Sequence, residues 1–549
     1  MTPPAMLVLV VPALPAIAAA AIAVARPVGE RSARWAVRGA SAAFAATVVV
    51  MVVVAVDGPI AAVVEGGDGG ALVGLHATRV TAMLGLLTTG VGWVVQSFAG
   101  RQLQMDLRER RFFALASLLT AATTSVAFAA TLSLLTASWI LAGLALAGLV
   151  THRATWTPAR RSAQRTLRML WVGDTALLVA TLLAVVSVGE LDLRWPARAA
   201  EELANASIPV LGRNVLWVVA VLLTIAGISR SALVPLHQWL PSTIAAPTPV
   251  SALLHAGVVN GAGMLLVRLA PVFGSSAAAT HMAYAAGAVT ACYATTVMLV
   301  RSDVKGNLAW STAGQMGFMT VQVAIGAFSA ALLHIVGHGM YKAALFLGAG
   351  SAVTDHLRHE QRPVPHGVAR SVRLGVALLV PAAALVAAHL IFQPHLSTAA
   401  FVLMTVFAWA TAARAVSGWL HAAPFRPVPA VASAALGGAA GVFAYVGGLT
   451  AVETFVAGAA PAEVPEPVSA TLLVATLAAI ALLVAAVWLT PGERMRTLRS
   501  RMYALVLTSA PVSAPLTTRG SSTGVAPVPE SRQFHPRTEP EPARSTRST

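Results

Sequence analysis

Three ionisable side chains with four-residue spacing lie within one apolar stretch, ALLHIVGHGMYKAALFLGAGS. They are His334, His338 and Lys342. On a helix, residues four apart share a face and rise about 6 Å per step, so the three would form a ladder roughly 12 Å tall. Histidine titrates near neutrality, and a lysine amine can hold or release a proton. The spacing therefore predicts proton transfer along one helix. The alternative is that the histidines only satisfy polar packing between helices.

Arg230 and His255 flank a Pro-rich amphipathic linker. Arg230 lies inside an apolar run, and His255 follows the motif PTPVSALLHAG, in which Pro247 and Pro249 predict a non-helical entry. An arginine at the centre of a membrane helix costs roughly 2.5–3.5 kcal/mol on insertion scales, so its presence indicates a function. Arginine stays protonated in proteins, so we expect Arg230 to act as a fixed charge and not as a relay. Alternatively, Arg230 snorkels to the interface.

Two further charges lie at the edges of apolar runs. Asp174, in WVGDTALL, is predicted at the start of the sixth run, where it either pairs with a cation or serves as a capping or interfacial carboxylate. Lys305 follows Asp303 in RSDVKGNLAWSTAGQMGF. It lies either at the mouth of an ion path or at the membrane interface as an anchor.

The composition defines the elements that must position these residues. The chain has 549 residues, of which 57% are hydrophobic and 11% charged, and its mean hydropathy is +0.75. A soluble domain carries about 25% charged residues, so too few polar residues remain here to cover a water-facing surface. The high Ala, Val, Leu and Gly content favours helices over a barrel. We predict an all-α polytopic transmembrane helical bundle.

Apolar runs long enough to cross a bilayer recur about fifteen times. The predicted spans lie near 5–25, 39–57, 80–99, 112–131, 133–150, 169–188, 213–236, 249–270, 282–300, 307–326, 328–351, 373–392, 397–416, 428–450 and 468–490. The first could pass for a signal peptide, but many spans follow and no basic region precedes it, so we interpret it as a span.

The loops between these runs alternate in charge. The net charge is +16, and in a membrane protein such an excess marks cytoplasmic loops and does not indicate nucleic acid. The basic loops hold Arg26, Arg31, Arg34 and Arg38; Arg101, Arg108, Arg110 and Arg111; Arg153, Arg160, Arg161, Arg165 and Arg168; Arg358, Arg362, Arg370 and Arg373; and Arg494, Arg496, Arg499 and Arg501. The acidic loops hold Asp57, Glu65 and Asp68, and Glu190, Asp192, Glu201 and Glu202. This pattern predicts a cell inner (plasma) membrane protein with its N-terminus outside.

Residues 491–549 differ from the rest in composition. They are rich in Pro, Ser, Thr and Arg, which predicts a mostly disordered cytoplasmic basic tail, with 493–507 as a helix on the membrane surface. The single cysteine, Cys292, excludes a disulfide within the chain and a Cys-based metal site. No nucleotide, cluster or zinc motif is present. We therefore expect no cofactor, no metal and no catalytic site.

Several segments together resemble the proton-pumping antiporter-like membrane subunits, which include NADH-quinone oxidoreductase subunit L and the large Mrp antiporter subunits. The matching pieces are RRFF (110–113), VGDTALL (172–178), PTPVSALLHAG (247–257), SDVKGNLAWSTAGQMGF (302–318) and HIVGHGMYKAALFLGAGS (334–351). The resemblance implies two inverted five-helix repeats with broken helices, near spans four to eight and nine to thirteen. It also implies a proton path lined by Arg230, His255, His334, His338 and Lys342, which Lys305 could join.

The resemblance also suggests a division of the chain. Residues 1–110 would form N-terminal spans, 111–420 the conducting core, 421–490 C-terminal spans and 491–549 the tail.

The departures from the respiratory members are informative. Their fifth-span glutamate is Ile140 here, in SWILAG, and their broken-helix lysine is Arg230. Their second-repeat lysine has no counterpart, with only His395 nearby, and their long C-terminal lateral helix is missing. The stretch LLHAGVVNGAGMLLVR, with Asn260 after the histidine, is more similar to DabB, the membrane subunit of an energy-coupled inorganic carbon transporter.

That resemblance implies a hetero-complex. A DabB-like subunit conducts H+ or Na+ and powers DabA, a large peripheral protein resembling a zinc carbonic anhydrase. Two alternatives remain open at this point. One is a subunit of a cation/proton antiporter or respiratory NADH dehydrogenase-like complex, and the other is a non-conducting anchor that docks a partner.

Overall fold

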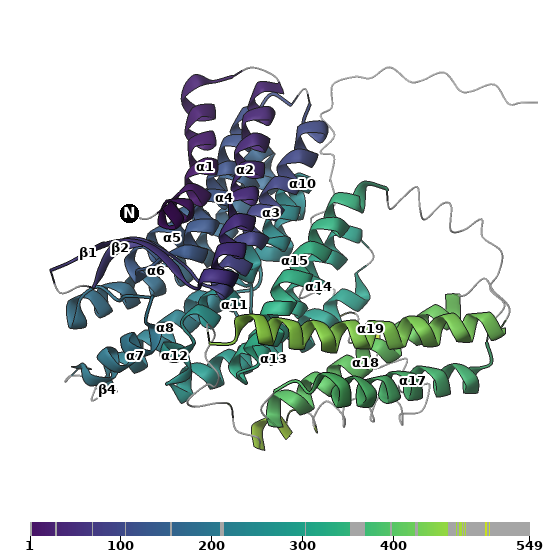
Figure 1. The fold of residues 1–549 in the computed structure, drawn as a ribbon. Helices are drawn as coiled ribbons and strands as arrows, with labels where there is room; N and C mark the ends of the chain where they lie inside the picture. Colours follow the sequence, from purple (N-terminus) through teal and green to yellow (C-terminus); the bar gives the residue numbers. More distant parts are fainter. Residues whose placement is uncertain are drawn as a thin grey trace, which may run out of the picture. The chain divides into compact units, whose positions relative to one another are not determined.

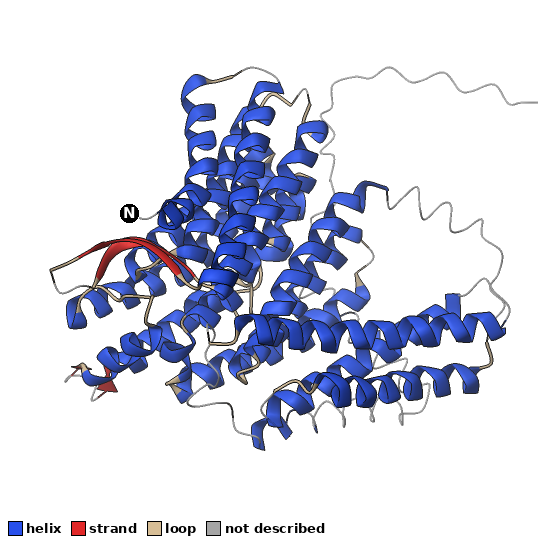
Figure 2. Cartoon of the chain, in the orientation of Figure 1, coloured by secondary structure: helices blue, strands red, loops and turns tan. Residues whose placement is uncertain are grey.

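Long helices form most of the part of the chain that the structure describes (Figure 2). The computed structural model describes residues 3–27, 30–67, 70–104, 106–153, 156–208, 213–301, 303–351, 368–395, 398–422, 427–458 and a few isolated residues between 468 and 504. All of these belong to one unit, residues 1–510. The predicted tail, the surface helix 493–507 and most of the last predicted span lie outside the described residues.

Within the described ranges, twelve helices are long and apolar enough to cross a membrane, and α8 is a shorter apolar helix. Eleven of the twelve are α1 (Pro3–Ala25), α2 (Glu30–Asp57), α3 (Arg79–Gln102), α4 (Glu109–Phe128), α5 (Leu132–Val150), α6 (Thr157–Val188), α13 (Ala277–Val300), α15 (Phe328–Gly348), α17 (Arg370–Phe392), α18 (Thr398–Ala422) and α19 (Pro427–Val456), and the twelfth is the broken span described next. Helices α8 (Val215–Arg230) and α14 (Val304–Ala324) complete the set. Together with the broken span described next, they confirm the predicted polytopic helical bundle, and the prediction of about fifteen spans agrees with this set.

The eighth predicted span, 249–270, is broken into pieces. Its parts are α10 (Thr248–Ala256), the 3-10 turn η4 (Val258–Asn260), α11 (Gly261–Arg268) and the start of α12 (Ala270–Gly274). Asn260 donates from its side-chain amide to the Ala256 carbonyl at 2.8 Å, which satisfies one carbonyl that the break leaves without its helical partner. Irregular backbone at membrane depth is tolerated where the protein buries it, as here.

A second irregular stretch precedes this span. The chain leaves α8 at Arg230 and passes through residues 231–238, α9 (Trp239–Ser242) and the 3-10 turn η3 (Thr243–Ala245). The Trp239 indole N–H donates to the Ser229 carbonyl at 3.0 Å, which ties the linker to the end of α8. Pro247 then precedes α10 in non-helical conformation, as predicted, but Pro249 lies in the first turn of α10, where a proline is tolerated because its missing N–H would have no helical partner.

The first acidic loop contains a feature that the sequence analysis did not predict. It forms an antiparallel hairpin of β1 (Ile60–Glu65) and β2 (Ala71–Ala77), in which Ile60 pairs with Ala77 (Figure 2). Valine-rich strands around a Gly-rich turn favour such a hairpin. A second short pair, β3 (Ser207–Ile208) and β4 (Arg213–Asn214), follows the helix α7 (Pro196–Asn205).

Loops of like charge lie together at the same end of the helices. At one end, Arg108 donates to the His152 carbonyl at 2.7 Å, which joins two basic loops. At the other end, the Ala71 amide donates to Asp192 at 3.4 Å, which joins the two acidic loops. These contacts agree with the predicted alternation of loops between the two faces of the membrane.

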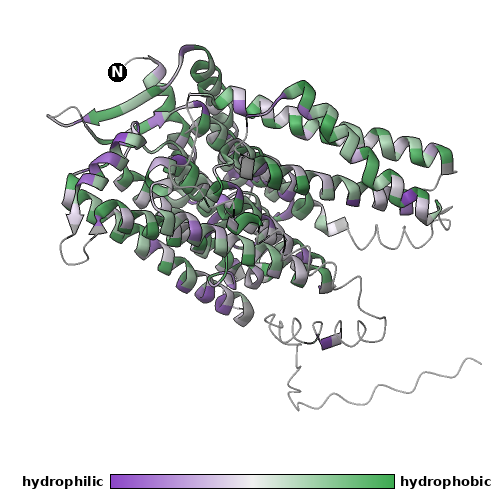
Figure 3. Ribbon diagram, turned by 90° about the horizontal axis from the view of Figure 1, so that it is seen from below, coloured by the Kyte–Doolittle hydropathy of each residue, from purple (hydrophilic) through white to green (hydrophobic). Residues whose placement is uncertain are grey.

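The helices pack in two sets. Helices α1 to α4 pack against one another, α6 packs on α8, and α10 and α14 both pack on α15. Helices α17, α18 and α19 lie side by side (Figure 1), and they contact the rest where α19 packs on α15 and where Phe407 of α18 stacks on Phe318 of α14. Figure 3 shows that most of the helices are rich in hydrophobic residues. Many large hydrophobic side chains are exposed, including those of Val186, Leu379 and Leu390. Lipid would cover such surfaces.

Candidate functional site

The predicted ladder exists on α15 and faces α14. His334 and His338 have ring centroids 5.9 Å apart, and Lys342, one turn further, is only 1% exposed. The Lys342 ammonium donates to the Ser311 hydroxyl and lies 3.4 Å from the Leu308 carbonyl. The three groups therefore share one face of a helix, as their spacing predicted.

Helix α14 supplies a matching row of neutral polar groups. The Gln315 side-chain oxygen lies 2.9 Å from His338 Nδ1, and the Gln322 side-chain oxygen lies 2.9 Å from His334 Nδ1. Sequence reasoning missed Ser311, Gln315 and Gln322. The signal was available, because the intervals of four and seven residues between them place all three on one helical face.

His255 joins the ladder from α10. Its ring stacks on Phe346 with centroids 4.3 Å apart, and its backbone carbonyl lies 3.2 Å from His338 Nε2. The ring is 2% exposed, and its Nδ1 has no hydrogen-bond partner among the described residues. The structure thus brings His255 and His338 together, although 83 residues separate them in the chain.

Arg230 and Asp174 form a second centre. Arg230 Nη2 lies 2.8 Å from Asp174 Oδ1 and donates to the Trp139 carbonyl at 2.9 Å. The guanidinium also lies over the Trp139 ring, 4.4 Å from its centroid. Because Arg230 is buried and ion-paired, it does not snorkel to the interface, and that alternative is wrong.

The sequence analysis predicted Asp174 at the start of the sixth apolar run. In the structure it does not lie at the start of its helix. Helix α6 begins at Thr157, because the basic stretch before the apolar run is also helical. Asp174 is therefore an internal residue that does not cap its helix, and it pairs with a cation, Arg230, as one of the two alternatives predicted. The fifth span contributes Trp139 and no carboxylate to this centre, since its next residue is Ile140. The carboxylate comes from α6.

Helix α5 approaches this ion pair closely at Gly143. A Cβ on Gly143 would lie 3.2 Å from both the Arg230 guanidinium and the Asp174 carboxylate. A larger residue there would have to displace one of the two charged groups by a few tenths of an ångström.

A small cavity adjoins the Arg230 centre. It has a volume of about 20 Å³, and its lining includes Arg230, Trp139 and, from the broken span, Gly257 and Val258. A space of this size has room for about one water molecule. The break that follows His255 therefore contributes to the lining of a cavity beside the fixed charge.

The remaining predicted residues lie further out. Lys305 donates to the Ala246 carbonyl at 3.3 Å. Along α14, Lys305 precedes Leu308 by three residues, and the Leu308 carbonyl faces Lys342. His395 is exposed and lies 3.5 Å from Glu453, so the structure does not place it in the buried row. Beyond His334, the Gln322 amide nitrogen reaches Met404 Sδ at 3.2 Å. A thioether has no proton to pass on.

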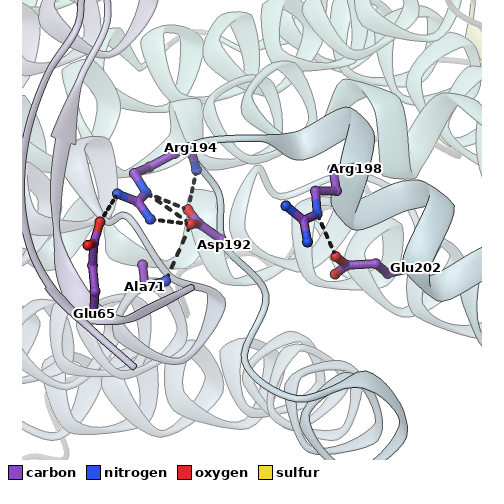
Figure 4. Close-up of polar contacts among 6 residues, drawn as sticks. All are labelled: Glu65, Ala71, Asp192, Arg194, Arg198 and Glu202. Carbon is purple, nitrogen blue, oxygen red and sulfur yellow. Dashed lines mark hydrogen bonds and ion pairs between the residues drawn. The ribbon is translucent and has the colours of Figure 1, made fainter. Parts of the chain in front are cut away.

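A separate polar cluster anchors the β-hairpin (Figure 4). Arg194 bridges Asp192 at 2.7 Å and Glu65 of β1 at 2.9 Å, while Arg198 pairs with Glu202 along α7. Burial acts to raise the pKa of Asp192, but the hydrogen bonds and charge of Arg194 outweigh it and hold the pKa below its usual range. Among the described residues, no three His, Cys, Asp or Glu side chains gather as a metal site.

Comparison with known proteins defines the class. The family model described as "NADH:quinone oxidoreductase/Mrp antiporter, TM" matches residues 129–409, just over half of the chain. The chain therefore belongs to this family of membrane antiporter-like subunits. The match includes both buried centres described above.

Individual relatives show which members of this family the chain resembles. The chain is 31% identical over 370 residues to the probable inorganic carbon transporter subunit DabB1 of Halothiobacillus neapolitanus, which covers 64% of this chain and 66% of that protein. It is 33% identical over 298 residues to NADH-quinone oxidoreductase subunit L of Rhodobacter capsulatus, covering 52% and 42%. These matches span slightly under two thirds and under half of the relatives' own lengths.

A solved structure shows the same fold. A chain of the Mrp complex from Dietzia sp. superposes with a TM-score of 0.57 at 22% identity, covering 92% of this chain and 60% of that one.

Proposed function

We propose that this protein is the ion-conducting subunit, carrying H+, of an energy-coupled inorganic carbon (CO2/bicarbonate) transporter of the DabB type. The observation that carries the proposal is the row His334, His338 and Lys342 facing neutral partners on α14, in which His338 and Lys342 are buried and His334 is half-buried. The name of the relative DabB1 supports the carbon-transport assignment. The subunit has no catalytic site of its own in this proposal.

The two centres have different roles, proton transfer in one and a fixed charge in the other. Each of His334, His338 and Lys342 can hold or release a proton, so the row passes protons along α15. Arg230 keeps its charge, and its partner Asp174 confines that charge to one place, so the pair sets the local field. Each proton that moves inward delivers about 2.3 kcal/mol per 100 mV of membrane potential.

This energy would drive a partner. Hydration of CO2 takes place on a DabA-like peripheral protein that holds the zinc, and proton entry makes uptake unidirectional. We assign residues 111–420 to the conducting core, which contains the whole family match. We place the N-terminus outside and the tail in the cytoplasm of the cell inner membrane, because basic loops share one end of the helices.

The deciding experiment compares His338→Ala with a control, His281→Ala. His281 lies in the first turns of α13 and bonds only its own helix, at the Ala277 carbonyl. We expect His338→Ala to assemble with its partner but to abolish bicarbonate accumulation in cells and proton flux in vesicles. His281→Ala should retain both. Normal uptake by His338→Ala would overturn the proposal.

A second candidate is a subunit of a cation/proton antiporter or respiratory NADH dehydrogenase-like complex, favoured by the likeness to subunit L. The chains that co-purify separate the two. One large zinc-containing protein supports the first candidate, and a set of small membrane subunits or iron–sulfur proteins supports the second. A protein that binds a partner but carries no ion flux in vesicles would be the non-conducting anchor.

A further inference from the structure

His338 has different kinds of partner on its two ring nitrogens. Nε2 faces the backbone carbonyl of His255 at 3.2 Å, and Nδ1 faces the side-chain amide of Gln315 at 2.9 Å. A carbonyl oxygen only accepts hydrogen bonds, so Nε2 must carry a hydrogen whenever this contact is made. A neutral imidazole has one N–H, and the contact places it on Nε2.

The exchangeable proton of His338 is therefore the one on Nδ1. When the ring is charged, Nδ1–H donates to the Gln315 amide oxygen, which is the orientation in the structure. When the ring is neutral, the bare Nδ1 needs a donor, and the Gln315 NH2 group is one. A half-turn about the terminal torsion of Gln315 exchanges its amide oxygen and its NH2 group. This torsion is soft and roughly two-fold.

Gln315 is free to make this turn, and Gln322 is not. The Gln322 amide nitrogen is held by Met404 Sδ at 3.2 Å while its oxygen faces His334. Among the described residues, the Gln315 amide nitrogen has no hydrogen-bond partner to lose. Gln315 is also partly exposed, whereas the His255 carbonyl is buried, so the Nδ1 side is the more accessible one.

The titratable groups near His338 lie on α15 and α10, whereas Gln315 on α14 is neutral. The titratable groups near the ring are His334 and Lys342 on its own helix and His255 on α10. Helix α14 faces the row with neutral groups, Ser311 and Gln315. An acidic partner would favour only the charged ring, and an apolar one would satisfy neither state.

We propose that Gln315 is a positioning residue that reverses its amide each time His338 gains or loses a proton, and that it restricts proton exchange to Nδ1. Gain of a proton converts the neutral Nε2–H ring into an imidazolium with hydrogens on both nitrogens, and loss restores it. The transport role rests on the proposed function, but the tautomer of His338 does not.

The first test reads the tautomer directly. The full chain, labelled with ¹⁵N-histidine, is placed in lipid vesicles, and His338 is assigned by the signals lost in His338→Asn. We expect a neutral ring with its hydrogen on Nε2 at high pH and hydrogens on both nitrogens at low pH. A neutral ring protonated on Nδ1 would overturn the proposal, whether or not the protein conducts.

The second test alters the amide. Gln315→Met removes both the hydrogen-bond donor and the acceptor of the side chain, and Gln315→Glu keeps only the acceptor. The matched control is Gln96→Met, because Gln96 is a buried glutamine that bonds Ser117 and Thr120 on a neighbouring helix. We expect Gln315→Met to lower proton flux at least about tenfold, since one hydrogen bond of about 1.5 kcal/mol is lost in each cycle. Gln96→Met should keep wild-type flux.

The outcomes separate the two proposals. Gln315→Glu should keep hydrogens on both His338 nitrogens up to a higher pH than in the wild type, and its flux should fall most at high pH, where proton release limits it. If Gln315→Met conducts normally while His338→Ala does not, the role of Gln315 is wrong and the proposed function stands. If His338→Ala conducts normally, the proposed function fails, and the ¹⁵N signals still decide the tautomer.

Discussion

The two buried centres of this protein treat charge in opposite ways. Around Arg230, a permanent cation is matched by a carboxylate and by the Trp139 carbonyl and ring. Around His338 and Lys342, the partners are a serine, a glutamine and backbone carbonyls. Neutral partners tolerate a group in either protonation state, whereas a carboxylate favours only the cation. The comparison teaches that one centre is built to keep its charge and the other to exchange it.

The largest effect should come from breaking the permanent pair. We expect Asp174→Ala to lower the free energy of unfolding by about 3–5 kcal/mol, because it leaves Arg230 buried without a counter-charge. Thermal unfolding in detergent would measure the loss. The double variant Asp174→Leu with Arg230→Met should recover most of it. If the single variant is as stable as the wild type, the two charges do not depend on each other.

A smaller effect should follow from crowding the same pair. Gly143→Ala places a methyl group 3.2 Å from both charged groups, so we expect a loss of about 1–3 kcal/mol. The matched control is Gly337→Ala on α15, where nothing lies within 4 Å of the new methyl group. That change should be neutral or stabilising by up to about 1 kcal/mol. Equal effects of the two substitutions would contradict the close approach at Gly143.

The exchanging centre should respond in function and not in stability. We expect Lys342→Met to change the free energy of unfolding by less than about 1 kcal/mol, because its partners are neutral. Ser311 keeps a hydrogen bond to the Leu308 carbonyl at 3.0 Å. Proton flux in vesicles should nevertheless be lost. A loss of stability as large as that of Asp174→Ala would remove the distinction between the two centres.

The smallest effect concerns the hairpin outside the membrane. The pKa of Asp192 is lower in the folded protein than in the unfolded chain, so its contribution to stability is present above the unfolded pKa, near 4, and is lost as the pH falls through the folded pKa. For this half-buried ion pair in a loop we expect about 1 kcal/mol. The protection of the Ala71 amide, taken relative to the intrinsic exchange rate at each pH, should fall below about pH 4, and Asp192→Asn should abolish this dependence. An exchange rate of Ala71 that follows pH in the same way in both proteins would argue against it.

Histidine 76 adds a check on the same hairpin. Burial lowers its pKa to about 4, and the charges of Arg268 and Arg194 add to the effect. The unfolded pKa of a histidine is near 6.5, so His76 costs stability as the pH falls from about 6.5 to about 4, a range above that of Asp192. Repeating the Ala71 measurement in His76→Gln would separate the two groups.

Much of the fold followed from the sequence by local rules. Apolar runs of about 20 residues predicted the spans, and four-residue spacing placed His334, His338 and Lys342 on one face, because helical geometry depends only on neighbours along the chain. The hairpin 60–77 was missed, since its strands are short and lie in a loop that the charge pattern described only as acidic. The start of α6 was misplaced, because a basic amphipathic helix does not show in an apolar profile.

What the sequence by itself determined is the class of the protein, its spans and the residue types able to hold charge within them. Only the tertiary structure decided which of those residues meet. Asp174 and Arg230 are 56 positions apart, and His338 lies 23 positions from Gln315 and 83 from His255. Such pairs depend on how whole helices pack and where one of them breaks. Spacing along a single helix carries no information about the helix that faces it.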